Sequence, residues 1–369
     1  MNETILFLYL RSRNSDYLGL MKKISFVSLF IIFFSTIPFC FSQIGGKGVY
    51  EFLNLAIPAR VSALGGTLIS AKDNDLNLSF QNPALLDSTM HNSLSLSYIN
   101  YLADIRYSYA SYSRTYRNVG SFSAGIQSLN YGSFIGADKN GELTGNFTAA
   151  DYSLNLAYSR PIGTMFSIGG TLKTIYSKYS EYTSVGSALD LGGVYNDQKH
   201  LFTSALIIKN IGKQWKTYYG LHEPLPFEIQ FGLTKKITHA PFRISLTATH
   251  LERWDLTYVD PSIPTTDPIT GVPITKSAIS TFSDKLARHA VVGGEILLSK
   301  NFNLRLGYNY QRRQELKLES HPGIAGFSFG FGLKIYKFHL SYSYAKFHAA
   351  GGPNNFTIST NFSEYYSKK

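Results

Sequence analysis

The feature that most constrains this chain is a two-residue alternation of apolar with polar or small side chains, which recurs from residue 93 to the end of the 369-residue sequence. In a β-strand, side chains two positions apart share a face, so each alternating segment would form a strand with one apolar face. One example is the apolar set Tyr152, Leu154, Leu156 and Tyr158, which alternates with small or polar residues. Fourteen such segments begin near residues 93, 105, 119, 151, 165, 185, 200, 226, 241, 288, 302, 325, 338 and 355.

The length and composition of these segments favour a membrane barrel over a soluble sandwich. The segments run for about nine to thirteen residues, near the length that a tilted strand needs to cross the hydrocarbon. Aromatic residues make up 15% of the chain and charged residues only 16%, whereas charged residues are roughly 25% of an average soluble protein. No stretch after residue 42 offers about 18 continuous apolar residues, so no spanning helix is expected. The prediction is an all-β, transmembrane antiparallel β-barrel of about 14 strands. A secreted soluble β-protein stays open on composition alone.

The lengths of the connections alternate as well. Alternate connections are short, at residues 116–118, 161–163, 196–198, 237–241, 299–301 and 336–337, and most of the others are long, at 131–150, 210–225, 254–285 and 312–323. The first connection, at residues 102–104, is a short exception. Bacterial outer-membrane barrels have short periplasmic turns and long external loops. This parity predicts an integral outer-membrane protein with its long loops extracellular and both the N-terminal plug and the C-terminus periplasmic.

The first 42 residues have the pattern of a secretory signal peptide. Met21-Lys22-Lys23 is a basic start, residues 24–41 are mainly apolar, and Ser42 is a small residue before the expected cleavage site. Met21 is an alternative start of translation, and an uncleaved membrane anchor is the alternative interpretation. Cys40 is the only cysteine, so the mature chain would hold no thiol, disulfide or Cys-ligated metal.

Residues 43–92 lack the alternation and carry glycine pairs and an Asn-Pro step, which are typical of a compact segment with tight turns. We expect a plug here, inside or under a barrel formed by residues 93–369. A charge within the plug would need a partner. Arg60 is expected either to pair with Asp73 or Asp75 in a polar lumen or to lie solvated at the periplasmic side. The candidate plug residues are Arg60, Gly65, Gly66, Asp73, Asp75, Asn82 and Pro83.

The search for catalytic chemistry yields two formal matches. The run Gly326-Phe327-Ser328-Phe329-Gly330 fits the nucleophile elbow, but it lies within a predicted strand instead of a strand-to-helix turn. The run from Asp73 to Asn77 imitates a calcium loop, but Leu78 stands where glycine is required. A turn held by Asp side chains is favoured over a metal site. The expectation is a non-enzymatic protein with no cofactor and no catalytic or metal residues, although a hydrolase assembled from separate strands stays open.

Charge and loop composition suggest which partners to expect. The net charge is +11, but the basic residues are scattered, so a nucleic-acid surface is not indicated and outer-membrane lipid is the expected neighbour. The connection at residues 254–285 is rich in proline and is a candidate docking loop for a protein partner. Its candidate residues are Trp254, Asp260, Pro261, Pro264, Pro268 and Pro273.

The plug carries a family resemblance. The runs Val49-Tyr50-Glu51-Phe52-Leu53-Asn54-Leu55, Ala59-Arg60-Val61-Ser62-Ala63-Leu64-Gly65-Gly66 and Asn77-Leu78-Ser79-Phe80-Gln81-Asn82-Pro83-Ala84-Leu85-Leu86 resemble the opening of the PorV/PorQ family. These are outer-membrane proteins of the type IX secretion system of the Bacteroidota, and they resemble FadL-type barrels of fourteen strands with an N-terminal hatch.

The resemblance implies a role in protein secretion. The chain would be the membrane anchor of a surface attachment complex, with PorZ as the first expected partner and PorU and PorV as others. The rival hypothesis is a FadL-like transporter of hydrophobic small molecules. Such a transporter needs an apolar pocket, and the expected lumen-facing residues, such as Ser153, Asn155, Glu228 and Gln230, are polar.

Overall fold

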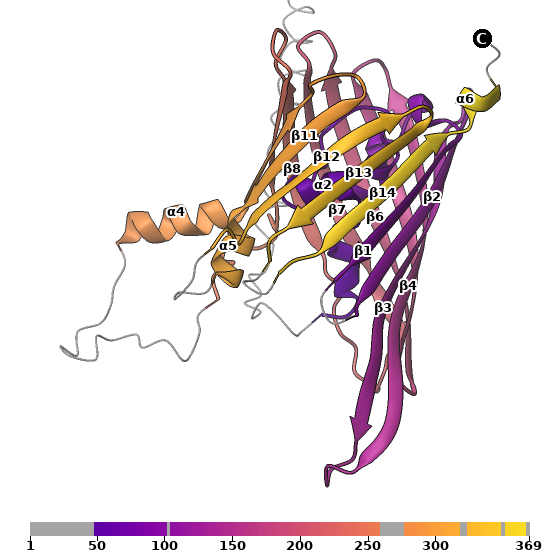
Figure 1. The fold of residues 1–369 in the computed structure, drawn as a ribbon, viewed down its shortest axis with the longest axis vertical. Coiled ribbons are helices and arrows are strands. Elements are labelled where there is room, and N and C mark those ends of the chain that lie inside the picture. Colours follow the sequence, from indigo (N-terminus) through magenta and orange to yellow (C-terminus); the bar gives the residue numbers. More distant parts are fainter. Residues whose placement is uncertain (1–47, 102–103, 259–276, 318–322, 348–350, 367–369) are drawn as a thin grey trace, which may run out of the picture. The chain divides into compact units, whose positions relative to one another are not determined.

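Fourteen antiparallel strands close into a barrel in the computed structural model, which describes residues 48–101, 104–258, 277–317, 323–347 and 351–366 (Figure 1). Each strand pairs with its neighbours in sequence, and β1 closes the barrel on β14. The strands are β1 Ser93–Asn100, β2 Arg106–Tyr116, β3 Gly120–Ala137, β4 Leu143–Ile162, β5 Phe166–Tyr179, β6 Tyr182–Asp197, β7 Phe202–Lys216, β8 Glu228–Lys236, β9 Phe242–Ala248, β10 Ala290–Ile296, β11 Phe302–Asn309, β12 Phe327–Ile335, β13 Phe338–Ala345 and β14 Asn354–Asn361. The predicted fold class is confirmed.

The alternation in the sequence becomes an apolar outer face and a polar lumen. In β4, Tyr152, Leu154 and Leu156 are exposed on the outside, whereas Ser153 and Asn155 are buried inside. Aromatic residues lie toward the ends of this apolar stripe. Tyr152 stacks on Tyr176 of β5, and Tyr158 packs on Phe122 of β3, with ring centroids 6.4 and 4.9 Å apart, respectively.

Two predicted connections have different lengths in the structure. Residues 131–150 are not a long loop, because β3 and β4 continue as a hairpin whose tip is residues 138–142. The register shifts between Asn130 and Ser133, after which Phe134 stacks on Phe147 with centroids 5.3 Å apart. The bulge interrupts the two-residue period of the sequence, so the continuation of both strands beyond it was not predicted. Strand β7 continues to Lys216, inside the connection predicted at 210–225. Residues 180–181, between β5 and β6, form a further short connection where the parity predicts a long loop.

We call the two ends of the barrel the turn end and the loop end. The turn end carries the short connections that precede β3, β5, β7, β9, β11 and β13, and also the short helix α6 (Ser363–Tyr366). The loop end carries the long connections, two of which contain helices that the alternation did not predict: α4 (Ala278–Arg288) and α5 (Tyr310–Leu316) (Figure 1). Ser277 starts α4 by accepting a hydrogen bond from the Ser280 amide, as an N-cap residue does. Within the described ranges, no helix has the length and apolar character to cross a membrane.

The segment before β1 forms five short helices inside the barrel: η1 (Glu51–Asn54), α2 (Ala59–Ala63), α3 (Asn77–Gln81), η2 (Pro83–Leu85) and η3 (Ser88–Met90). Helix α2 packs against β11–β14, and η2 packs against β4–β6 on another part of the wall. We call residues 48–92 the plug. The expected signal peptide, residues 1–42, and the first five residues of the predicted plug, 43–47, lie outside the described residues.

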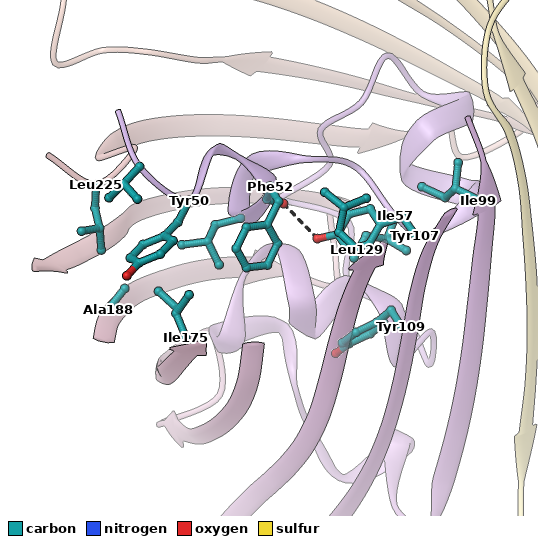
Figure 2. Packing of buried hydrophobic residues seen from close by; sticks show 12 residues of the cluster. Tyr50, Phe52, Ile57, Ile99, Tyr107, Tyr109, Leu129, Ile175, Ala188 and Leu225 are labelled. Atoms are coloured by element: carbon teal, nitrogen blue, oxygen red, sulfur yellow. Dashed lines mark hydrogen bonds between the residues drawn. The ribbon is translucent and has the colours of Figure 1, made fainter. Parts of the chain in front are cut away.

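The apolar core joins the plug to the wall. Figure 2 shows plug side chains, among them Tyr50 and Phe52, meeting side chains of β1, β2, β3, β5 and β6. The Tyr107 hydroxyl on β2 donates a hydrogen bond of 2.9 Å to the Phe52 carbonyl, and the two rings meet edge to face. A second cluster, around Leu64, Ile69 and Leu85, is also fully buried. A third, smaller cluster, formed by Leu76, Leu86 and Met90, lies within the plug itself. Most of the apolar core of the plug is therefore shared with the barrel.

Candidate functional site: the charged anchor of the plug

Arg60, on helix α2, joins the plug to the barrel wall. Its guanidinium donates hydrogen bonds of 3.0 and 2.8 Å to the two carboxylate oxygens of Asp73, and one of 3.2 Å to Asp75. It also donates two hydrogen bonds of 3.0 Å to the carboxylate of Glu295 on β10. Arg60 is only 5% exposed. Of the two environments expected from the sequence, the structure has the paired one.

Three charged wall residues complete this site, and sequence reasoning missed them. Glu295 on β10 lies directly across from Arg243 on β9 and from Arg305 on β11. Arg243 contacts Asp73 and Glu295, both at 2.9 Å, and Arg305 contacts Glu295 at 3.3 Å. Three guanidinium groups thus face three carboxylates, and we call these six residues the charged anchor. Charged residues at lumen-facing positions of three consecutive strands were the signal that could have revealed it.

The electrostatics of the charged anchor favour the ionised state. Burial alone would raise the pKa of Asp73, but Arg60 and Arg243 lower that pKa well below its ordinary value of 3.8. Burial would lower the pKa of Arg60, but the opposite charges of Asp73 and Glu295 raise that pKa above its ordinary value. Removing one member of a buried ion pair typically costs about 3–5 kcal/mol, because its partner is left uncompensated. The anchor therefore links the plug to β9 and β10 through charged pairs that stay ionised at neutral pH.

Gly65 and Gly66 fit the plug against β11 and β12. Both residues have a positive φ, of 96° and 99°, which glycine adopts without a steric penalty. The Gly65 amide donates a hydrogen bond of 3.0 Å to the Ser328 hydroxyl, which in turn donates one of 3.0 Å to the Ala63 carbonyl. A Cβ atom on Gly307 would lie 2.1 Å from the Gly65 nitrogen. Ser328 is therefore a plug contact within β12, and its position in an interior strand does not meet the geometry of a nucleophile elbow.

Asn82 and Pro83 dock the plug on a second part of the wall. Asn82 accepts a hydrogen bond of 3.0 Å from the Ala84 amide and donates one of 3.2 Å to the Ile69 carbonyl. Glycines on two adjacent strands leave room for this turn: a Cβ atom on Gly169 would meet Pro83 at 2.6 Å, and one on Gly192 would meet Asn82 at 2.0 Å. The turn cannot approach the wall this closely if either glycine carries a side chain.

The segment Asp73-Asn74-Asp75 forms a turn held by its own carboxylates. The Asp75 amide donates to Asp73 at 3.2 Å, and the Asn77 amide donates to Asp75 at 3.1 Å. The remaining carboxylate oxygens bind arginines of the charged anchor. Among the residues that the structure describes, no group of three His, Cys, Asp or Glu side chains could hold a metal ion.

Only one of the candidate docking-loop residues can be placed. Trp254 is half-exposed, and its ring lies 5.5 Å from Phe282 of α4 and 5.9 Å from His289. The candidates Asp260, Pro261, Pro264, Pro268 and Pro273 lie outside the described residues.

Comparisons with known proteins show the fold but no family. No protein-family model matches the chain, and no curated protein matches its sequence. Among solved structures, the toluene transporter TbuX of Ralstonia pickettii is similar with a TM-score of 0.51 and 11% identity, over 84% of this chain and 98% of that one. The toluene transporter TodX of Pseudomonas putida has a TM-score of 0.47 and 12% identity, over 83% of this chain and 96% of that one. A FadL homologue of Pseudomonas aeruginosa has a TM-score of 0.47 and 11% identity, over 86% of this chain and 100% of that one.

The similarity to TbuX defines a structural class. The chain has the fold of the TbuX barrel, here a closed barrel of fourteen antiparallel strands. At 11% identity the likeness extends to architecture alone. What the barrel does must be argued from the residues of its plug and loops.

Proposed function

We propose that this chain is a non-enzymatic, integral outer-membrane component of a type IX protein secretion system, with a fixed plug and with partner proteins bound at its loop end. The observation that carries the proposal is that the residues resembling the PorV/PorQ family are plug contacts. Arg60 belongs to the charged anchor, and the Gly65 amide donates a hydrogen bond to Ser328 of the wall. The turn at Asn82 and Pro83 packs on glycines of β5 and β6. A plug that is attached to the barrel wall at several separate places is expected in a scaffold protein more than in a transporter, whose lumen must open.

The outer face of the barrel supports the placement in a membrane. Its exposed side chains are mainly aliphatic and aromatic on every side, as Leu96, Leu156, Leu206 and Phe329 illustrate. Exposed apolar surface of this extent is stable only in contact with lipid or a partner. The turn end would face the periplasm and the loop end the cell exterior, which puts the C-terminus near the periplasm. The plug would run through the lumen, from Val49, whose amide donates a hydrogen bond of 3.0 Å to the Pro224 carbonyl at the loop end, to its junction with β1 at the turn end. The expectation of a plug confined to the periplasmic side is therefore corrected.

The experiment that tests this proposal is a pull-down of the tagged protein from detergent-solubilised outer membranes. Co-purification of PorZ, PorU or PorV supports the role as membrane anchor of the attachment complex, with PorZ expected first. Deleting residues 259–276 tests whether that connection provides the contact, with a deletion of hairpin residues 135–146 at the same end as the matched control. Recovery of the intact barrel without any of these proteins would refute the proposal.

A second candidate function is transport of hydrophobic small molecules, and the shared fold with the toluene transporter TbuX favours it. Transport through the lumen requires the plug to move or to leave a path. Bound fatty acid or hydrocarbon in the purified barrel, with no protein partner, would favour this second candidate.

A further inference from the structure

The apolar band of the barrel is interrupted where its strands are shortest. Strands β9 and β10 contain seven residues each. With a rise of ~3.4 Å per residue and a tilt of ~40°, such strands span roughly 18 Å of the ~25 Å apolar band of an outer-membrane barrel. Strands β3 and β4, by contrast, contain 18 and 20 residues. The outer surface beside the loop-end termini of β9 and β10 therefore needs another source of apolar side chains.

Helix α4 supplies them. Its residues Ile279, Phe282 and Leu286 share one face, at the spacing of an amphipathic helix, and they are 81%, 56% and 53% exposed. The opposite side of α4 is polar and attached to the loop end. There Asp284 accepts a hydrogen bond of 2.8 Å from Tyr310 of α5, and Lys285 pairs with Asp255 at 2.7 Å. These contacts fix which face of the helix stays uncovered.

An apolar groove of about 360 Å³ runs between this helix and the outside of the barrel. It is lined by Leu246 and Ala248 of β9, Leu251, Trp254, and Leu286 of α4. Leu246 is one of the outward-facing residues of the barrel, exposed like Ile244 before it. The groove is thus continuous with the apolar outer surface of the barrel, and its volume is in the range of small-ligand sites, ≈300–1,000 Å³.

We propose that this groove binds the acyl chain of a lipid in the outer leaflet, and that α4 lies in the membrane interface and completes the apolar band above β9 and β10. This inference rests on the membrane placement proposed above but not on the secretion role. An acyl chain fits because the exposed lining is mainly aliphatic and aromatic, and the polar residues Thr247, Arg253 and His289 complete it. Trp254 is suited to this depth, since tryptophan favours membrane interfaces.

The fluorescence of Trp254 provides a test of this proposal. The chain has two tryptophans, so Trp215→Phe leaves Trp254 as the only one. The variant is reconstituted in phosphatidylcholine vesicles with or without bromine at mid-chain positions of the acyl groups. Trp254 should lose roughly half of its emission to the brominated lipid, because an interfacial helix buries its apolar face ~5–10 Å into the headgroup–acyl boundary. Adding Phe282→Ser and Leu286→Ser should reduce this quenching, whereas Ser283→Ala, on the same helix, should leave it unchanged.

A reference variant separates failure of this inference from failure of the membrane placement. With both tryptophans replaced by phenylalanine and Leu154→Trp introduced, the new tryptophan reports the middle of the outer face of β4. Quenching at residue 154 without quenching at Trp254 would overturn the lipid groove and leave the membrane placement intact. Absence of quenching at both would overturn both. A photo-crosslinker at position 282 that yields protein adducts instead of lipid adducts in cells would also overturn the groove assignment and indicate a partner protein.

Discussion

Arg60 and Glu295 form a bidentate pair, with two hydrogen bonds of 3.0 Å between the plug and β10. The same guanidinium holds both oxygens of Asp73 within the plug. Arg60 thus connects the turn of the plug to a rigid strand of the barrel. Because the pair is buried, solvent and salt screen it weakly. The account of a fixed plug depends first on this contact.

Glu295→Gln should destabilise the protein strongly. The amide keeps the shape of the side chain but leaves three arginines, Arg60, Arg243 and Arg305, facing two carboxylates. We expect a loss of about 3–5 kcal/mol in the free energy of unfolding, the usual effect of breaking a buried pair. Urea unfolding in lipid vesicles measures it. The matched control is Glu142→Gln at the exposed hairpin tip, and equal stability of the two variants would contradict the anchor.

Gly307→Ala should also destabilise the protein, because the new Cβ atom would lie 2.1 Å from the Gly65 nitrogen. Overpacking of this kind costs about 1–3 kcal/mol. Gly294→Ala is the control on the neighbouring strand, since the nearest atom to a Cβ atom there is 3.9 Å away. Thermal unfolding of both variants should separate them. A Gly307→Ala variant as stable as the control would mean that the plug is not seated as described.

Ser328→Ala tests the two hydrogen bonds between β12 and the plug. The substitution removes the acceptor of the Gly65 amide on the wall and the donor to the Ala63 carbonyl, and leaves that amide only its bond of 3.3 Å to the Ser62 carbonyl. The loss should cost about 1–3 kcal/mol. Ser343→Ala on β13 is the control, because the buried Ser343 hydroxyl has no hydrogen-bond partner among the described residues. Loss of an ester-hydrolysing activity with unchanged stability would instead indicate a catalytic serine and contradict the structural role.

The stabilisation that Asp73 contributes should be constant near neutrality and be lost in strong acid. The folded-state pKa of Asp73 lies below its ordinary value of 3.8, so the unfolded chain binds the proton more readily. The stabilisation is therefore complete above about pH 5 and is lost as the pH falls through 3.8 toward the folded-state pKa. Unfolding measured from pH 7 to pH 2 should show this decline in the native chain. Asp73→Asn should have lower stability at neutral pH and a shallower decline; an unchanged decline would assign the acid sensitivity to other groups.

The strand pattern made the barrel predictable, because lumen and outer face impose opposite polarity on alternate residues. The residues Tyr152 to Tyr158 carry that signal without interruption. The extension of β3 and β4 was not predictable from the same rule, since the register shift at Asn130 breaks the period. Helix α4 was missed for a different reason: its apolar residues repeat at helical spacing within a connection that otherwise reads as a loop.

The plug was recognisable as a non-strand segment, and Arg60 stood out as a charge that needed partners. The partners inside the plug, Asp73 and Asp75, were close in sequence and could be named. Glu295 could not be named, because its contact with Arg60 spans 235 positions and depends on how the plug is rotated within the barrel. Local patterns do not determine that rotation.

The most direct test of a fixed plug is to lock it covalently. A Cβ atom on Gly293 would lie 3.1 Å from the Cβ atom of Leu64, so Leu64→Cys with Gly293→Cys places the two Cβ atoms slightly closer than the ≈3.5–4.5 Å that is usual across a disulfide. Surface attachment of type IX cargo is then compared in cells carrying the oxidised or the reduced pair. A fixed plug predicts equal attachment in both states, with the single Leu64→Cys variant as control. Attachment that is lost on oxidation and restored by reductant would show that the plug must move.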